Sequence, residues 1–421
     1  MSDPEGRLTH DWLASYLDLT KDLEAKESLH LWTGFILLSA VVRRKLKLVM
    51  KHGIIYPNMY VIFVAKSARA RKSSAMGFGR KLLEQALPDQ RLMGNSMTSQ
   101  GLIHALNQKV QIIKDDKIQE ELQSDVAIFA DEVSNLFSFD PKAAKSLTMF
   151  FTECYECPDI YTHTTVKDRV IKLFNLYPVL FGATDPRNLN AIPEQAAGGL
   201  IGRLIWIIES DRRKNSSGWI NDEADALRTE LLREYAIHDL IHISKLKGVM
   251  HASEKSMKLY DDWYEALSRK DPGDPNADAF YQRCHTTALR IAMLLSISQN
   301  DTLLISEKQM MAAITLIERQ LPEVRNIVTL TGGSDFEQKR AKLIMFLQSA
   351  SGGIAFWRAA LKHMGMLTAD FVALLETLKI DGTIEIPPMK IRGDLTLKLT
   401  KNGYGSAESI TAAESEKQQT T

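Results

Sequence analysis

The sequence of 421 residues is poor in cysteine. Three cysteines in a chain of this length argue against a disulfide framework and predict a reducing compartment. Cys154 and Cys157 form a Cys-x-x-Cys pair, but Cys284 and His163 do not complete a convincing zinc set. Because a structural zinc takes about four ligands, we expect two reduced, half-buried thiols at this pair.

The sequence also lacks net charge, an export signal and a long apolar run. Lys and Arg total 52, as do Asp and Glu, so any nucleic-acid contact must come from a local basic patch. The first residues are polar and acidic, unlike a signal peptide. The apolar run Leu29–Val42 is shorter than a membrane span and basic residues follow it at once. We therefore expect a cytoplasmic protein that does not enter a membrane.

Apolar runs alternate with helical patterns through the first half of the chain. Such alternation predicts an α/β core around a parallel sheet. Residues 8–50 have helical spacing, with Lys45–Met50 turning extended, and the stretch from Asp222 to about Val328 is almost wholly helical in pattern. The charged run Lys114–Glu121 suggests a solvated helix face or a hairpin tip, and His163–Phe174 a hairpin. The expected buried strands are Met59–Val64, Asp125–Ala130, Tyr177–Ala183 and Leu204–Ile208.

The last part of the chain has the pattern of a winged helix. Three expected helices precede two short strands, in the order Phe336–Leu347, Phe356–His363, Thr368–Leu378, Thr383–Ile386 and Leu395–Leu399. The tail from Lys401 is polar, and we expect it to be disordered. The predicted organisation is a helical N-terminal region (1–56), a core (57–215), a helical lid (216–330), a winged helix (335–400) and a tail (401–421).

The most informative absence is that of glycine after the strand Met59–Val64. A small-residue loop leads there into Lys72-Ser73 and a helical pattern, which is the layout of a phosphate-binding loop. Lys66 and Arg71 occupy the two glycine positions of G-x-x-x-x-G-K-[ST], so we expect another backbone path around the phosphates. An ordinary strand-to-helix turn is the alternative. The predicted nucleotide contacts are Ser67, Ala68, Arg69, Ala70, Arg71, Lys72, Ser73 and Ser74.

Polar side chains follow two further strands and suit the chemistry of such a loop. Lys72 can reach the terminal phosphates, and the Ser73 hydroxyl can bind Mg²⁺. Asp131 would bind the same metal and Glu132 would polarise the attacking water. Thr184, at the end of the third strand, would position that water. For Thr184 the alternative is a strand-ending turn, because Thr-Asp-Pro is good turn chemistry.

Two arginines are candidates for action on a transition state. Arg203 follows a Gly-rich turn and precedes a strand, where it could reach the nucleotide of a neighbouring subunit. A strand-capping role is the alternative, and Arg212 and Arg213 compete with it. Arg283 and Arg290 lie seven residues apart on one expected helix. Arg283 could act from the lid, whereas Arg290 sits in an apolar stripe and is expected to be paired or structural.

Together these segments resemble one family. They are Tyr56–Tyr60, Ser67–Ser73, Phe129–Glu132, Gly182–Pro186 and Gly199–Arg203. The family is that of the P-loop (AAA+/RecA-like) ATPases of phage and mobile-element replication proteins, of the primase–helicase C-terminal type. Its members often carry Arg-Lys-Ser in place of Gly-Lys-Ser. The resemblance covers about residues 10–300, and the arginine spacing and winged helix are similar to those of minichromosome-maintenance helicases.

The resemblance implies an ATP-dependent DNA motor. It would use ATP and Mg²⁺, hydrolyse ATP at the subunit interfaces of an oligomer such as a hexamer, and act as a helicase or replication initiator, with a primase as a possible partner. A basic fringe on the winged helix would contact DNA through Lys362, Lys379, Lys390, Arg392 and Lys398. A winged helix that contacts protein is the alternative for that unit. The alternative for the whole chain is a nucleotide-binding scaffold or loader without processive hydrolysis.

Overall fold

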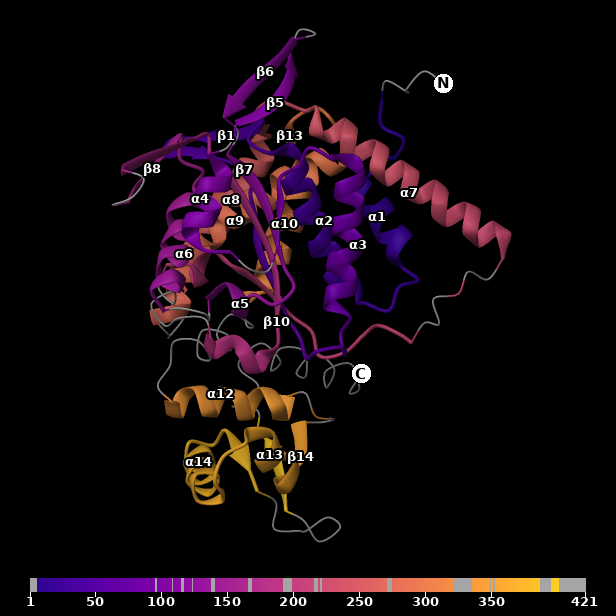
Figure 1. Cartoon of the computed structure of the whole chain (residues 1–421). Helices are drawn as coiled ribbons and strands as arrows, with labels where there is room; N and C mark the ends of the chain where they lie inside the picture. Colours follow the sequence, from indigo (N-terminus) through magenta and orange to yellow (C-terminus); the bar gives the residue numbers. More distant parts are fainter. Residues whose placement is uncertain are drawn as a thin grey trace. The chain divides into compact units, whose positions relative to one another are not determined.

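A computed structural model gives the fold (Figure 1). It describes residues 6–94, 97–107, 109–114, 117–122, 124–137, 141–165, 169–191, 199–215, 219, 222–270, 275–321, 335–348, 350, 353–386 and 395–400. The chain forms two compact units, residues 1–320 and residues 321–421. The predicted N-terminal region, core and most of the lid region therefore fall within one unit, and their finer boundaries stay predictions. In the described parts, no helix combines the length and apolar character needed to cross a bilayer.

A five-stranded parallel sheet forms the centre of the first unit. Its order is β11-β3-β10-β7-β4, and every pairing is parallel. All residues of β3, β7 and β10 are buried, which explains their unbroken apolar runs. The strands are β3 (Tyr60–Val64), β4 (Leu92–Met93), β7 (Asp125–Ala130), β10 (Tyr177–Thr184) and β11 (Ile205–Ile208). All four predicted strands are confirmed, and β4 is an addition.

Helix α2 (Glu27–Val42) is buried along nearly its whole length. Such a helix must be covered on all sides, and its apolar residues contact strands β3 and β10 as well as other helices. The predicted helical stretch contains α1 and α2, separated by residues 21–26, and the extended conformation expected at Lys45–Met50 is confirmed by a strand over Leu46–Met50. The helices packed around α2 are α1 (Trp12–Thr20), α3 (Lys72–Ala86), α7 (Glu223–Ser244) and α9 (Pro275–Gln299).

A second, four-stranded sheet joins the N-terminal region to the region predicted as a lid. Its order is β13-β12-β1-β2, and β1 pairs in parallel with β12. The segment predicted as almost wholly helical thus contains two strands besides α8 (Glu254–Ser268) and α10 (Glu307–Glu318). These strands are too short to show a clear alternation of apolar and polar residues in the sequence. They are β1 (Leu46–Met50), β2 (Gly53–Ile55), β12 (Gly248–Ala252) and β13 (Leu304–Ile305).

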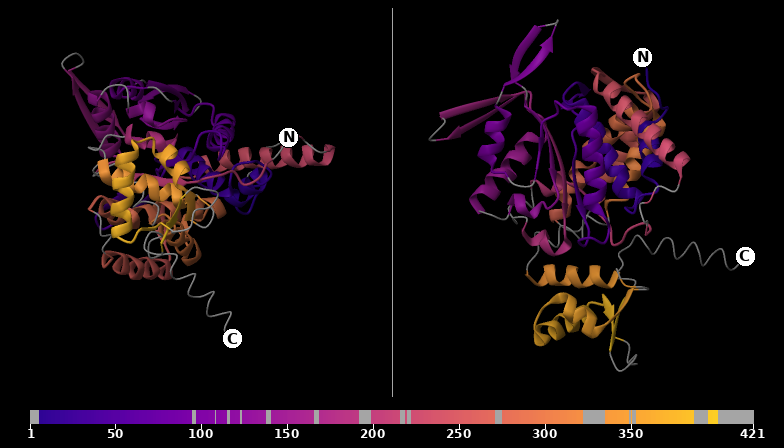
Figure 2. Two further views of the ribbon diagram at one scale, coloured as in Figure 1. Left: turned by 90° about the horizontal axis from the view of Figure 1, so that it is seen from below. Right: turned by 45° about the vertical axis from the view of Figure 1, so that its right-hand side comes forward.

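Two antiparallel hairpins project from the first unit (Figures 1 and 2). One joins β5 (Lys109–Lys114) to β6 (Lys117–Leu122), so of the two alternatives for the charged run the hairpin is confirmed and the helix face is wrong. The other joins β8 (Ile160–Thr165) to β9 (Arg169–Phe174) and confirms the predicted hairpin. The remaining short elements are α4 (Ser99–Leu106), α5 (Ser134–Phe137), α6 (Pro141–Cys154), η1 (Pro186–Ala191) and η3 (Ile201–Arg203).

The second unit is a winged helix. Its three strands form an antiparallel sheet of order β14-β16-β15, and β14 is a strand that the sequence did not reveal. The apolar core contains Leu343 and Leu347 together with Phe371, Leu375 and Leu397. The elements are α12 (Asp335–Gln348), β14 (Ile354–Phe356), α13 (Trp357–Met364), α14 (Thr368–Ile380), β15 (Ile384–Glu385) and β16 (Thr396–Leu399). The predicted tail 401–421 lies outside the described residues.

Candidate functional site

The loop of residues 65–71 joins the carboxyl end of β3 to the first residue of α3. Ala65 N donates to Thr184 O over 3.2 Å, which ties the start of the loop to β10. Ala68 has φ +61° and Arg71, the residue that caps α3, has φ +58°. Arg71 therefore adopts the left-handed conformation without being glycine, whereas Lys66, at the other glycine position, is not among the residues with positive φ. The left-handed conformation costs a residue other than glycine about 1–2 kcal/mol. The path of the loop around bound phosphate stays a prediction.

Lys72 lies at the buried end of this loop, and 6% of the residue is exposed. Its Nζ donates to Ala65 O over 2.8 Å, so the ammonium group turns back onto its own loop. Burial lowers the pKa of Lys72, while the nearby charges of Glu132 and Asp185 act in the opposite direction. The Lys72 ammonium group thus lies within the electrostatic influence of two carboxylates, and Ser73 and Ser74 lie exposed in the first turn of the helix.

Glu132 and Thr184 meet although they follow different strands. Glu132 Oε1 accepts hydrogen bonds from Thr184 Oγ1 over 2.7 Å and from Ser134 Oγ over 2.8 Å. Thr184 is fully buried at the end of β10, and Asp131 is exposed directly after β7. Because the carboxyl ends of parallel strands share one edge of a sheet, β3, β7 and β10 bring these groups and the loop together. The first unit thus has the parallel α/β layout that the sequence predicted, with the loop at the carboxyl edge of the sheet.

Asp185 is a site residue whose contacts the sequence did not reveal. Its Oδ2 accepts a hydrogen bond from Ser67 N over 3.0 Å, so it holds the loop from the neighbouring strand end. Arg187 Nε lies 2.9 Å from Oδ1 and Arg187 Nη2 lies 3.0 Å from Oδ2. Burial raises the pKa of Asp185, but the hydrogen bonds from Arg187 and Ser67 outweigh it and hold that pKa well below its usual range. The Thr-Asp-Pro turn was the only sequence signal for this residue.

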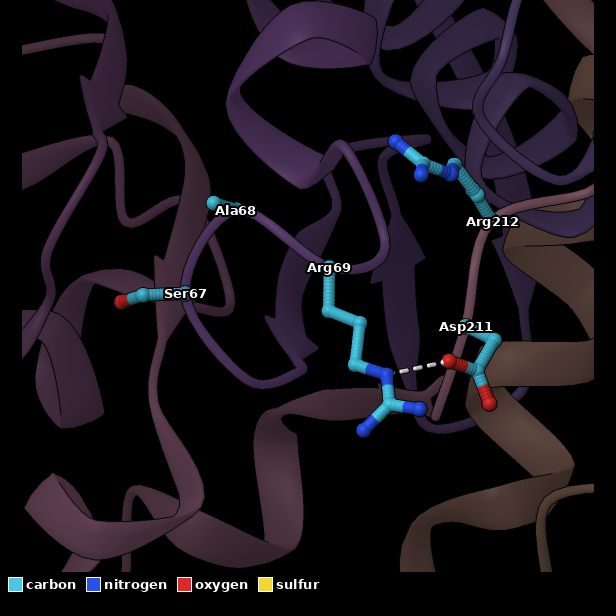
Figure 3. Close-up of a pocket in the computed structure, with 5 residues that line it drawn as sticks. All are labelled: Ser67, Ala68, Arg69, Asp211 and Arg212. Atoms are coloured by element: carbon cyan, nitrogen blue, oxygen red, sulfur yellow. Dashed lines mark hydrogen bonds and ion pairs between the residues drawn. The ribbon is translucent and has the colours of Figure 1, made fainter. Parts of the chain in front are cut away.

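A cavity of about 440 Å³ lies on the arginine-rich side of the loop (Figure 3). Arg69 Nε lies 2.5 Å from Asp211 Oδ1 there. Arg212, a competing finger candidate in the sequence, lies beside the loop of its own chain, with Nη1 3.3 Å from Glu24 Oε1. The cavity is therefore bounded by cations that already have acidic partners. Its lining residues are Ser67, Ala68, Arg69, Asp211 and Arg212.

Arg203 and Arg283 lie together, but at the other edge of the sheet. Arg203 precedes β11, whose Ile205 pairs with Val61 near the start of β3, whereas the loop of residues 65–71 follows the end of β3. Arg203 Nη1 donates to Gly199 O over 2.5 Å. A Cβ built on Gly202 would lie 3.1 Å from Arg283 Nη1, which shows how closely Arg283 approaches this turn. Burial and the charge of Arg283 lower the pKa of Arg203. Neither arginine lies at the loop of residues 65–71 in its own chain.

Arg290 is buried and paired, as its position in an apolar stripe predicted. The residue is fully buried, and its guanidinium carbon lies 3.8 Å from the centre of the Tyr155 ring. Its Nη2 lies 3.1 Å from Glu156 Oε2.

The nearby Cys154 and Cys157 are free thiols that are fully buried and not half-buried as expected. Burial raises the pKa of Cys157 to about 12. Within the described ranges, no three His, Cys, Asp or Glu side chains form a metal-binding group.

The basic residues predicted for DNA binding lie on several elements of the winged helix. Lys362 is exposed on α13 and Lys379 is exposed in the last turn of α14. Lys398 on β16 lies 3.7 Å from Glu385 Oε2. The exposed side of α14 also carries Asp370 and Glu376, so it is not uniformly basic. Contact with DNA and contact with protein both stay predictions for this unit, and Lys390 and Arg392 lie outside the described residues.

Comparison with known proteins gives only a distant likeness. No protein-family model matches the chain, and no curated protein matches it in sequence. A provisionally named ATPase from Cytophaga hutchinsonii is similar over 72% of this chain and 85% of its own, with 13% identity and a TM-score of 0.36. A full-length MCM homolog from Methanopyrus kandleri is similar over 74% of this chain and 59% of its own, with 12% identity and a TM-score of 0.39.

Proposed function

We propose that the protein is an ATP-dependent DNA motor that binds Mg²⁺ and ATP at the loop before α3. The observation that carries the proposal is the hydrogen bond between Thr184 and Glu132 at the edge of the parallel sheet where the loop that leads to Lys72 begins. A cation at a helix N-terminus can bind a polyphosphate. An acidic side chain held by hydroxyl donors can orient the water molecule that attacks the terminal phosphate.

Each residue at this edge has a distinct role in the proposal. Lys72 would leave Ala65 O and bind the terminal phosphates, while main-chain N–H groups of the loop bind the others. The exposed Ser73 hydroxyl and Asp131 carboxylate are hard oxygen ligands that fit Mg²⁺. The metal would offset phosphate charge when it is bound. Glu132 would orient the attacking water, and Thr184 would hold Glu132.

The two arginines at the opposite edge support action between subunits. Arg203 is partly exposed and Arg283 lies beside it, so both could serve the nucleotide of a neighbouring copy. The proposal therefore includes a homo-oligomer, with a hexameric ring as its simplest form. DNA would be bound by the winged helix through Lys362, Lys379 and Lys398, and by Lys390 and Arg392. A role in phage or mobile-element replication, with a primase as partner, is the finer part of the proposal.

Nucleotide binding and subunit sharing can be tested with three single variants. Wild type should bind ATP with Mg²⁺ and hydrolyse it, Lys72→Ala should lose binding, and Glu132→Gln should bind without turnover. Mixed oligomers of Arg203→Ala and Lys72→Ala subunits should recover activity, because some interfaces then have both intact residues. A mixture no more active than either parent would contradict action in trans.

A second candidate function is a nucleotide-binding scaffold or loader that positions DNA or a partner without processive hydrolysis. The observation that favours it is the turned-back Lys72, together with the left-handed Arg71 in place of glycine. Both features make the loop harder to rearrange around phosphate. A wild type that binds ATP with Mg²⁺ but shows no turnover, alone or with DNA, would favour the scaffold over the motor.

A further inference from the structure

Glu24 contacts the phosphate loop from the segment between α1 and α2. Its Oε2 lies 2.6 Å from Arg71 Nε, and its Oε1 lies 3.3 Å from Arg212 Nη1. The carboxylate thus joins the last loop residue to the segment that follows β11. The side chains of Glu24 and Arg71 are 23% and 36% exposed, so water screens this pair less than it screens the outer pair Arg69–Asp211, whose side chains are 62% and 52% exposed.

Glu24 is itself held in place by its neighbours. Arg213 N donates to Glu24 O over 2.9 Å, which fixes the main chain at the contact. On either side, Lys26 Nζ lies 2.5 Å from Glu209 Oε2 and Lys214 Nζ lies 2.8 Å from Asp22 Oδ1. Residues 22–26 are therefore attached at several points to residues 209–214. A carboxylate fixed in this way can set the position of a partner instead of following it.

Arg71 needs such a partner because of its backbone. It stands where a phosphate loop normally has glycine, directly before Lys72, and it adopts φ +58° and ψ +31°. This conformation is unfavourable for arginine, and its loss would redirect the N–H groups at the start of α3. The ion pair holds the guanidinium group toward Glu24. It therefore stabilises the left-handed backbone conformation, from which the side chain reaches Glu24, over the alternatives. Arginine can thus fill a glycine position here because its side chain is anchored.

We propose that Glu24 is a positioning residue for the phosphate site, acting through Arg71 in place of the missing glycine. This inference rests on the proposed nucleotide binding. It deepens that proposal by assigning the stability of the glycine-free loop to a residue about fifty positions before it in the chain. In this role Glu24 does not touch the nucleotide. Its effect on nucleotide affinity passes entirely through the conformation of Arg71.

A double-mutant cycle in the full chain tests the inference. The probe is the non-hydrolysable ATP analogue AMP-PNP with Mg²⁺, and its Kd is measured by calorimetry. Glu24→Gln should weaken binding about tenfold in wild type, yet less than about twofold in an Arg71→Gly background, because glycine adopts the left-handed conformation unaided. The matched control is Asp18→Asn, which removes an exposed acidic partner of Lys21 and Arg228 outside this contact and should change the Kd less than about twofold.

The outcomes separate this inference from the proposed function. An unchanged Kd in Glu24→Gln, or an equal loss with and without Arg71→Gly, would overturn the positioning role while nucleotide binding stands. A wild type that binds no AMP-PNP would contradict the proposed function. In that case thermal unfolding reports on the contact alone, since Glu24→Gln should lower Tm more in wild type than in Arg71→Gly. Equal lowering in both backgrounds would overturn the inference.

Discussion

The hydroxyl of Thr184 lies 2.7 Å from Oε1 of Glu132, although the two residues are 52 positions apart in the chain. Parallel pairing of β10 with β7, in which Gly182 is opposite Ala130, brings the two strand ends to the same level. The position of the proposed catalytic carboxylate is therefore set by the neighbouring strand. The sequence had suggested instead that Thr184 positions the water itself.

Thr184→Val should slow ATP hydrolysis by about tenfold or more while changing nucleotide affinity little, because it removes a donor from Glu132 and leaves the loop intact. The measurements are kcat and the Kd for AMP-PNP. Thr184→Ser keeps the hydroxyl and should retain most of the activity. Equal kcat values for Thr184→Val and Thr184→Ser would contradict the role of this hydrogen bond.

Gly182→Ala should destabilise the protein and reduce hydrolysis together. A Cβ at this position would lie 2.0 Å from Val133 Cγ2 and 2.9 Å from Ile62 Cδ1, so the turn that carries Glu132 must shift. We expect a loss of about 1–3 kcal/mol in the free energy of unfolding, measured by denaturant titration. Gly77→Ala is the control, since its Cβ would meet nothing within 4 Å and it lies within α3. That control should be neutral or stabilising.

Ala68→Gly should raise the free energy of unfolding by up to about 1 kcal/mol, because Ala68 is exposed with φ +61° and glycine removes the strain. Thermal unfolding measures the change. Ala70→Gly provides the comparison in the same loop. Ala70 is fully buried and is not among the residues with positive φ, so glycine there should destabilise. The same sign of change in both variants would contradict the conformation described for the loop.

His30 should make stability depend on pH. It is 1% exposed, and neither ring nitrogen has a hydrogen-bond partner in the described residues. Burial first, and then the charge of Arg213, lower the pKa of His30 from 6.5 to about 4. Between these two pH values the unfolded chain binds a proton that the folded chain does not. Stability should therefore fall by about 3 kcal/mol as pH decreases through this window.

Denaturant titrations from pH 7 to pH 4 would measure this effect. His30→Phe should have a flatter pH dependence than wild type in that range, because the variant has no group to protonate at this position. The exposed residue His52 offers a control, since His52→Phe should keep the wild-type slope. A slope in His30→Phe equal to that of wild type would contradict the prediction.

Much of the fold could be predicted because burial left a strong pattern in the sequence. Strands β3, β7 and β10 are enclosed on both faces, so each is a continuous apolar run with clear ends. Strand β12 has only a partly buried pattern and pairs with β1, about two hundred residues away. Nothing local distinguishes such a strand from a turn between helices, and the helical signal around it dominated the prediction.

The candidate site could also be predicted only where the signal is local in the sequence. Asp131 and Glu132 directly follow β7, and Lys72 follows the short loop after β3, so sequence order alone placed them at one edge. The left-handed conformation of Arg71 could not be predicted, because it depends on an ion pair with a distant residue. The hydrogen bond from Ser67 N to Asp185 and the anchoring by Glu24 are tertiary contacts between segments with no common motif.

The central claim is that this chain couples ATP hydrolysis to DNA. The most direct test is the steady-state rate of phosphate release by the full chain with ATP and Mg²⁺, measured with and without DNA, for wild type and Glu132→Gln. Wild type should turn over ATP and do so faster with DNA, while Glu132→Gln binds nucleotide with little turnover in either condition. A wild-type rate equal to that of Glu132→Gln, with DNA present and the oligomer confirmed, would contradict the claim.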